Sequence, residues 1–451
     1  MSKDYLDQIA RFAAELRWSD LPLEVVERAE WMLLDNLAVT LAAASEPRVR
    51  QLSAMLRRRG SQGRSVFWVD GARGDAADAA LVNATAACAH VLDEGHKYAR
   101  GHVGTYVLPA VLAVAEEREA NGRELITAIV AGYEIAARLG MACRVRESMH
   151  PSGTWGTVGA AAATARLMGF DAGRIREAMN VAAPLTLATS WQAATQGATV
   201  RDLYSGQGAW NAVMAPRWVE AGFTGSDDDV SHVFGHVSAE RFDREAAAAG
   251  LGTRWEVLRN YFKIHACCRN FQSGIDAALQ LRELHGLRAA DIVSVKAETF
   301  AVPARDNAEA RPANTLAAKE SFPVSLALTM VHGRCDQSVF SEANVADPEV
   351  ARLAAACSLS CDPELDALAP EKRPSRITLG LRDGRQVSAY EPVALGDPSR
   401  PLSPAQLESK FDQLVAGQVG AQRAQAIKQA VRDLHRQPDL RALTDLPRPA
   451  S

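Results

Sequence analysis

The chain has 451 residues, of which 47% are hydrophobic and 23% are charged. This balance is typical of a globular protein with a large core, and it excludes intrinsic disorder, collagen and a small disulfide scaffold. The formal net charge is −4, from 50 basic and 54 acidic residues. Since no basic excess is present, we expect neither a nucleic acid nor an anionic membrane as the main partner.

The cysteines and the apolar segments predict the compartment. Seven cysteines are scattered along the chain, and no two have the Cys-x-x-Cys spacing of zinc fingers or thioredoxin-like sites. Charges interrupt the first apolar residues, unlike a secretory signal, and the sequence shows no continuous apolar run long enough for a membrane span. We therefore expect reduced thiols in a cytoplasmic protein.

The first 260 residues or so predict helices. Apolar residues recur at helical spacing from Tyr5 to Leu16, which predicts an N-terminal amphipathic helix. Six further helices are predicted in segments of helical periodicity or of small residues: 23–44, 75–91, 109–117, 124–139, 156–168 and 206–221. Because Ala and Gly leave little side chain between backbones, we expect an interior bundle packed through small faces.

The pattern changes after about residue 285. Residues 292–299 are rich in β-branched side chains, which predicts a strand. The runs 376–381 and 386–390 flank Asp383-Gly384, a dipeptide favoured in hairpin turns. Helices are predicted around these strands at 322–331, 348–357 and 404–414. The stretch from about 270 to 398 thus predicts an α+β domain.

Residues 89–104 contain the first group suited to acid/base chemistry. His90, His96 and His102 occur there with Asp93 and Glu94, between two predicted helices. This combination favours an acid/base loop at the mouth of a pocket. The alternatives are a solvated loop and a zinc site, although the spacing matches no common zinc pattern.

A second group surrounds His150, which precedes a turn rich in Gly, Ser and Thr. This turn opens a predicted helix, and the free N–H groups of a helix N-terminus suit a carboxylate. The alternative is ordinary capping by Ser152 or Thr154.

A third group is the segment 263–269, where Lys263 and Arg269 are suited to holding an anion. The adjacent Cys267 and Cys268 are interpreted as small buried side chains, because vicinal thiols pair poorly. No dinucleotide fingerprint, P-loop, Gly-x-Ser-x-Gly or kinase motif occurs. We expect no metal and no cofactor.

Taken in order, these segments resemble the MmgE/PrpD family. The matching stretches lie between about residues 20 and 415: 83–93, 102–109, 132–134, 150–170, 206–225, 263–269 and 318–323. The resemblance implies a mainly α protein, with a large all-helical domain from residues 1–268 and 400–451. A smaller α+β lid domain, 269–399, is inserted between them. It also implies a homodimer and an active site in the cleft between the domains.

The resemblance also assigns residues to that cleft. Asp93, His102, His150 and Lys263 match an acidic residue, two histidines and a lysine of the family, and we expect them to be catalytic. Asp93 would orient one imidazole or act directly as acid or base. Substrate binding is expected from residues of the groups above and the matching segments: His96, Ser152, Arg201, Arg269 and Lys319.

Two departures from the family pattern concern the substrate. Residues 92–96 read Leu-Asp-Glu-Gly-His, where many members have Asp-Phe-Asp-Asp, and Arg201 stands where many have a lysine. Both departures change the donors of the pocket, so an individual substrate is not carried over from the family.

The resemblance implies a cofactor-independent lyase that moves a proton next to a carboxylate of a small di- or tricarboxylate. Cationic side chains would hold the negative charges and the histidines would transfer the proton. We put dehydration of the 2-methylcitrate dehydratase type first. The alternatives are decarboxylation of the cis-aconitate type, epimerisation of the iminodisuccinate type, and a non-catalytic carboxylate-binding scaffold. The expected partners are the carboxylate and a second copy of the chain.

Overall fold

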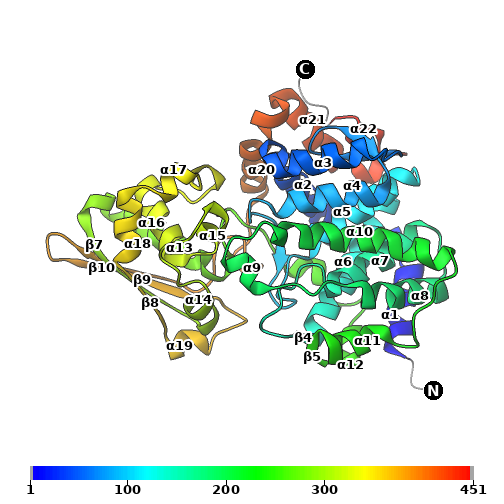
Figure 1. Ribbon diagram of the computed structural model, residues 1–451, viewed down its shortest axis with the longest axis horizontal. Helices are drawn as coiled ribbons and strands as arrows, with labels where there is room; N and C mark the ends of the chain where they lie inside the picture. The colour runs from blue at the N-terminus through cyan, green and yellow to red at the C-terminus, as the bar shows by residue number, and fades with distance from the viewer. Residues whose placement is uncertain (1–3, 447–451) are drawn as a thin grey trace.

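The computed structural model describes residues 4–446, and most of them are helical. Figure 1 shows two parts: a helical body, which contains both ends of the chain, and a smaller part that contains the main sheet, here called the lid. The mainly α fold class and its smaller α+β part are therefore confirmed.

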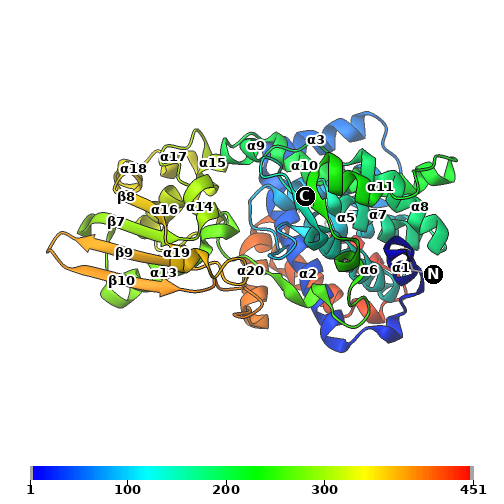
Figure 2. The same ribbon diagram turned by 90° about the horizontal axis from the view of Figure 1, so that it is seen from below.

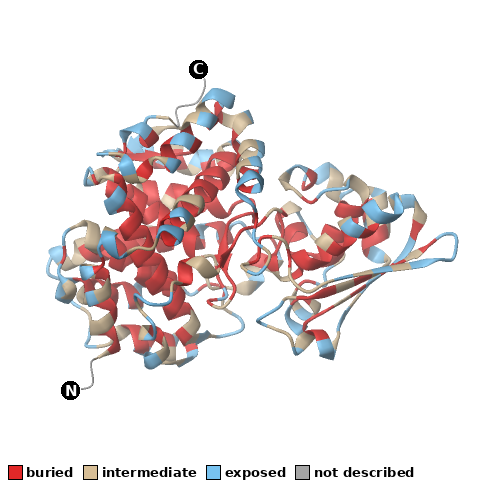
Figure 3. Cartoon of the chain, turned by 180° about the vertical axis from the view of Figure 1, so that it is seen from behind, coloured by how far each residue is buried: buried red, intermediate tan, exposed pale blue. Residues whose placement is uncertain are grey.

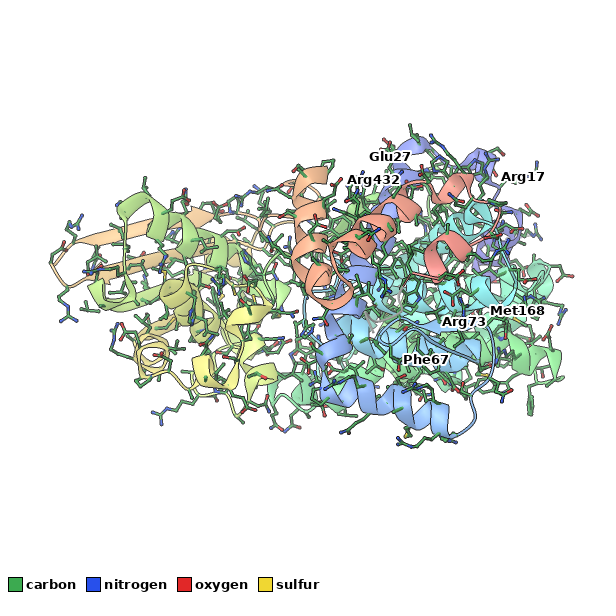
Figure 4. The ribbon with its side chains drawn as sticks, turned by 90° about the horizontal axis from the view of Figure 1, so that it is seen from above. Arg17, Glu27, Phe67, Arg73, Met168 and Arg432 are labelled. Carbon is green, nitrogen blue, oxygen red and sulfur yellow. The ribbon has the colours of Figure 1, made fainter. Side chains whose placement is uncertain are left out.

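Helices from both chain ends form the body. Those before the lid are α1 (Tyr5–Glu15), α2 (Leu23–Ala42), α3 (Pro47–Arg58), α4 (Ala76–Cys88), α5 (Val103–Glu117), α6 (Gly122–Ala142), α7 (Trp155–Leu167), α8 (Ala172–Ala182), α9 (Trp191–Thr195), α10 (Val200–Glu220), α11 (Asp229–His232) and α12 (Arg244–Ala248). Those after the lid are α20 (Pro404–Val419), α21 (Ala421–Arg432) and α22 (Arg441–Thr444). Arg73, labelled in Figure 4, lies between α3 and α4 and forms an ion pair with Asp445, directly after α22, at 2.7 Å.

The inner helices pack through small residues, as the sequence predicts. A Cβ atom added to Gly159 of α7 would lie 2.5 Å from the backbone nitrogen of Ala136 in α6. One added to Gly206 of α10 would lie 2.7 Å from the carbonyl oxygen of Leu81 in α4. Both distances are too short for any side chain, so glycine is required where these backbones meet.

Two helices begin earlier than the sequence predicts. Helix α5 starts at Val103, and Pro109 lies inside it instead of at its first turn. Helix α10 starts at Val200, so Gly206 is an interior residue. In both cases a residue typical of helix ends is tolerated within a buried helix, because tertiary packing outweighs local propensity.

Three short antiparallel pairs support the body. These are β1 (Ser65–Phe67) with β2 (Ala72–Gly74), β3 (Gly95–His96) with β6 (Asn260–Tyr261), and β4 (Cys143–Val145) with β5 (Ala239–Phe242). The pair of β3 with β6 matters most for function, because it brings the histidine-rich loop beside the segment that carries Lys263.

The lid contains a mixed four-stranded sheet in the order β10-β9-β7-β8. Its strands are β7 (Ile292–Thr299), β8 (Cys357–Cys361), β9 (Ser375–Leu381) and β10 (Gln386–Glu391). The predicted strand β7 and the predicted hairpin of β9 and β10 are confirmed. Strand β8, which pairs in parallel with β7, was not predicted, because the helical pattern was extended to Cys357 whereas α18 ends at Ala355.

One face of this sheet is covered by helices (Figure 2). The lid helices are α13 (Gln272–His285), α14 (Ala301–Asp306), α15 (Thr315–Lys319), α16 (Phe322–His332), α17 (Glu342–Val345), α18 (Pro348–Ala355) and α19 (Pro363–Asp366). Alternate residues of β9, Ile377, Leu379 and Leu381, are buried. The residues of β10 are intermediate or exposed, and Figure 3 shows the hairpin largely in these two colours.

The hydrophobic core has two clusters. The larger one combines residues from both ends of the chain within the body. The smaller one fills the lid and reaches the body through Val39, Ala87 and Leu92. The domain boundaries at residues 269 and 399 stay a prediction. Helix α6 is long and apolar enough to cross a membrane, but 94% of its most apolar window is buried inside the fold.

Candidate active site

A cavity of about 370 Å³ lies between the body and the lid. Body residues that line it include His102, His150, Arg201 and Lys263. The lid contributes a further set of lining residues, among them Arg269, Asn270, Arg305, Glu320 and Arg373. The cavity is therefore rich in cationic and imidazole groups, which is the composition expected of a site for a polyanion.

The pairing of β3 with β6 builds the inner end of the cavity. Gly95 is opposite Tyr261, and the His96 backbone exchanges hydrogen bonds with Gly101, so the loop returns to start α5. His102 is the residue immediately before α5, and Lys263 follows Tyr261 by two positions. Backbone pairing thus places His102 and Lys263 at the same wall.

His102 is held by two acceptors at one ring nitrogen. Its Nδ1 lies 2.8 Å from the carbonyl oxygen of Glu94 and 3.1 Å from Oδ2 of Asp93. Since a carbonyl oxygen only accepts, Nδ1 carries the hydrogen and donates it, and Nε2 of the neutral ring has a free lone pair. The ring is 16% exposed and lines the cavity, which suits a proton acceptor.

Burial keeps this imidazole neutral, and the surrounding cations keep its partner Asp93 ionised. Burial lowers the pKa of His102 to about 4, although Asp93 opposes the effect. Burial alone would raise the pKa of Asp93, but His102, Lys263 and Arg201 bring it well below its ordinary value. Lys263 is 3.7 Å from Asp93, and its own pKa is lowered by burial.

His150 has the opposite arrangement. Its Nδ1 accepts a hydrogen bond from the backbone N–H of Ser152 at 3.2 Å, so the hydrogen of the neutral ring is on Nε2. The ring stacks on Trp191 with centroids 4.9 Å apart. Burial and the charge of Arg201 lower its pKa well below the ordinary value. The cavity therefore contains one neutral imidazole that accepts a proton and another that donates an N–H.

The last residue of α4 and the loop that follows it collect cations from distant parts of the chain. Carbonyl oxygens of residues 88–92, here called the carbonyl loop, accept hydrogen bonds from four cations: Arg201 to Cys88 at 2.8 Å, Lys319 to His90 at 3.3 Å, Lys263 to Val91 at 2.9 Å and Lys410 to Leu92 at 3.0 Å. Val91 has a φ of 56°, which is strained for a β-branched residue. This strained turn directs one carbonyl toward Lys263.

Five of the nine residues expected in the site line the cavity: His102, His150, Arg201, Lys263 and Arg269. Asp93 is buried directly behind His102, where Thr105 donates a hydrogen bond to it at 2.7 Å. The structure thus brings these six residues together from segments far apart in the sequence.

Three residues expected to bind substrate lie outside the cavity lining. His96 is fully buried, accepts from the Ala99 N–H at 3.1 Å and lies 3.3 Å from Glu256. Ser152 contributes its backbone N–H to His150. The ammonium of Lys319 binds the carbonyl loop, and burial lowers its pKa to about 8. Their expected role in substrate binding stays a prediction.

Sequence reasoning missed several residues of the cavity wall. Tyr261 stacks edge-on to His102 and lies under the guanidinium of Arg269, at 4.6 Å. Trp191, Glu320 and Arg373 also line the wall. Arg373 and Glu320 lie in the lid. Glu320 belongs to the matching stretch 318–323, which could have pointed to it, whereas no matching stretch contains Arg373.

Two family models match most of the chain. Residues 7–239 match the MmgE/PrpD N-terminal domain, and residues 265–436 match the MmgE/PrpD C-terminal domain. The chain belongs to the MmgE/PrpD family. The second match covers the lid and extends into the helices that return to the body.

Proteins named as cis-aconitate decarboxylases, or as like them, are distantly similar over nearly the full length. A cis-aconitate decarboxylase from Aspergillus terreus is 25% identical, over 97% of this chain and 95% of that protein. The cis-aconitate decarboxylase-like protein oryM of Aspergillus oryzae is 24% identical, over 97% and 96%. The cis-aconitate decarboxylase of Homo sapiens is 23% identical, over 99% and 95%.

Proposed function

We propose that this chain is a cofactor-independent lyase that moves a proton next to a carboxylate in a small di- or tricarboxylate. The observation that carries the proposal is the pair of neutral imidazoles with opposite tautomers in one cationic cavity. Arg201, Lys263 and Arg269 are the groups that would hold the carboxylates, because charge-assisted hydrogen bonds are strong where water is excluded.

Decarboxylation of the cis-aconitate type is the first candidate reaction. The relatives named above favour decarboxylation. The sequence by itself favoured dehydration. In this reaction a carbon–carbon bond to one carboxylate breaks, CO₂ leaves, and the electron pair is delocalised toward a second carboxylate. His150 would stabilise that charge through its Nε2–H. His102 would first take up a proton from solvent at its free Nε2 and would then deliver this proton to carbon.

Dehydration is the second candidate, and the resting state of His102 favours it. A neutral imidazole with a pKa of about 4 is ready to remove a proton from carbon. The electron pair would form the double bond, and hydroxide would leave with a proton from Lys263, whose pKa burial has lowered. Atoms balance as loss of one water molecule.

A substrate screen tests the proposal. Purified protein is incubated with unsaturated and hydroxylated di- and tricarboxylates, and CO₂ release, water loss and solvent deuterium uptake are measured. CO₂ release identifies decarboxylation, and loss of water identifies dehydration. Deuterium uptake without either identifies epimerisation. Tight binding without turnover over the whole panel would contradict a lyase and support a non-catalytic scaffold.

We also propose a homodimer and a cytoplasmic location. The family resemblance supports the dimer, and the seven free cysteines fit a reducing compartment. Light scattering after size exclusion tests the first proposal, and fractionation of cells that express the tagged full chain tests the second.

A further inference from the structure

One acidic side chain in the cavity wall has no part in the reactions described above. Glu320, directly after α15, lines the cavity and is 5% exposed. Its Oε2 has no hydrogen-bond partner among residues 4–446. A buried acceptor without a partner costs free energy, and more so when it is charged. A group that pairs with this oxygen is therefore expected from a ligand.

The backbone around Glu320 is fixed. Its N–H donates to Ala317 at 3.0 Å, and its carbonyl accepts from the Asn307 side chain at 2.7 Å. The Cys268 N–H donates to the preceding carbonyl, that of Lys319, at 2.9 Å. Burial raises the pKa of the Cys268 thiol, and the neighbouring Glu320 carboxyl group adds to this effect. The backbone on both sides of this carboxyl group is thus held by hydrogen bonds.

The same wall offers a complementary unpaired donor. Nε of Arg201 is buried and has no hydrogen-bond partner within the described part of the chain. The charge of Glu320 acts on both Arg201 and Lys263, where it opposes the effect of burial on their pKa values. Two residues of the cavity lining, Glu320 and Arg201, therefore each have a buried polar atom without a partner in the described part of the chain.

We propose that Glu320 accepts a hydrogen bond from a hydroxyl or ammonium group of the substrate. A plain polycarboxylate offers only acceptors near neutral pH, so Glu320 repels it, whereas a hydroxy or amino carboxylate pairs with both Glu320 and Arg201. This inference rests on the proposed function and narrows its substrate class to carboxylates that carry such a donor. Cis-aconitate itself carries none, so the inference favours the dehydration of a hydroxy carboxylate over the decarboxylation of cis-aconitate. A site built around a substrate donor rejects the analogue that lacks it.

Matched ligand pairs test this inference by calorimetry on the full chain. Citrate and tricarballylate differ by one hydroxyl group, and aspartate and succinate differ by one ammonium group. The expected result is that the donor-bearing member of at least one pair binds roughly 10- to 100-fold more tightly, as for a hydrogen bond to a charged group. The pair that shows this preference identifies the donor.

The variant Glu320→Gln removes the charge and keeps the shape. We expect the preference in that pair to fall to about threefold or less, mainly because the member without a donor binds more tightly. Glu147→Gln is the matched control, since Glu147 also lines the cavity but is exposed and paired with Arg305 at 3.3 Å. The Glu147→Gln variant should prefer the donor-bearing ligand as strongly as the wild type does.

The outcomes separate this inference from the proposed function. Equal binding within both pairs by the wild type, with affinity lost in Lys263→Met, would overturn the role of Glu320 and leave the carboxylate site intact. An unchanged preference in folded Glu320→Gln would also overturn it. If no carboxylate binds to the wild type, the proposed function fails together with the inference. If Glu320→Gln does not fold, the relative affinities of the paired ligands for the wild type still test the inference.

Discussion

His102 has one nitrogen engaged by protein acceptors and one left for chemistry. Replacement by Gln is predicted to reduce kcat roughly 10²- to 10⁴-fold, the usual contribution of a positioned acid/base group. Steady-state kinetics on the substrate found by the screen would measure it. His232→Gln is the control, because His232 is exposed and outside the cavity lining. A His102→Gln variant with full turnover would remove this residue from the mechanism.

A second residue-scale prediction concerns Glu94, whose carboxyl group receives the Gly104 N–H of α5 and the hydroxyl of Tyr133 at 3.0 Å. Burial raises its pKa to about 8. The folded protein therefore keeps this proton where the unfolded chain loses it, and the associated stability declines as pH rises from about 4.5 to about 8.

Glu94→Gln removes this pH dependence while it keeps the hydrogen-bonding shape. We predict that the variant gains stability relative to the wild type as pH rises through that window, by at most about 1.4 kcal/mol per pH unit. Urea unfolding at several pH values between 5 and 8 measures the difference. A constant difference over this range would show that Glu94 is ionised in the folded protein.

The sequence predicts the position of some site residues but not of others. His102, His150 and Lys263 occur in segments with a recognisable order, so their presence in one cleft was predictable from the family resemblance. Glu320 and Arg373 lie on the lid, and their position depends on how the lid packs against the body. Tautomers depend on hydrogen bonds to backbone groups, which no sequence pattern shows.

At the scale of elements, the sequence pattern predicts those helices and strands that depend mainly on nearby residues. Helix α2 was predicted from residue 23 to 44 and runs from Leu23 to Ala42. The hairpin of β9 and β10 followed from its Asp-Gly turn, where Gly384 has a φ of 87°. Strand β8 depends on its pairing with β7, more than sixty residues earlier, and its short sequence carries no strand pattern of its own.

The carbonyl loop gives a prediction at this scale. Lys410 of α20 binds the Leu92 carbonyl and pairs with the buried Asp35 of α2 at 2.5 Å. Lys410→Met leaves that carboxylate buried and unpaired, so we predict a loss of about 3–5 kcal/mol in the free energy of unfolding. Denaturant unfolding followed by circular dichroism measures it.

Two comparisons make this prediction specific. The double variant Lys410→Met with Asp35→Leu should lose less than the single variant, because no charge is then left unpaired. Lys428→Met, whose partner Asp412 is 47% exposed, should cost less than about 1 kcal/mol. Equal losses in Lys410→Met and Lys428→Met would show that the carbonyl loop does not depend on the Lys410 charge.

At the scale of the whole molecule, the cavity takes cations from two separately packed cores. Arg100 and Arg201 come from the body, whereas Arg269 and Arg373 come from the lid. Arg373 donates to Asn270 at 3.3 Å and to the carbonyl of Lys97 at 3.2 Å, and no carboxylate of residues 4–446 pairs with it. A polyanion held by both parts would therefore tie the lid to the body.

This arrangement predicts that Arg373 binds the substrate and takes no part in the chemical step. Arg373→Gln should raise KM roughly 5- to 30-fold and change kcat less than threefold, because a charge-assisted contact at the rim is lost while the imidazoles stay in place. The KM of the wild type should also rise with ionic strength more steeply than that of the variant. Arg376→Gln is the control, since Arg376 pairs with Asp362 at 3.1 Å and lies outside the cavity lining. A fall in kcat with unchanged KM would instead place Arg373 among the groups that act in the transition state, and the lid would then contribute to the reaction itself.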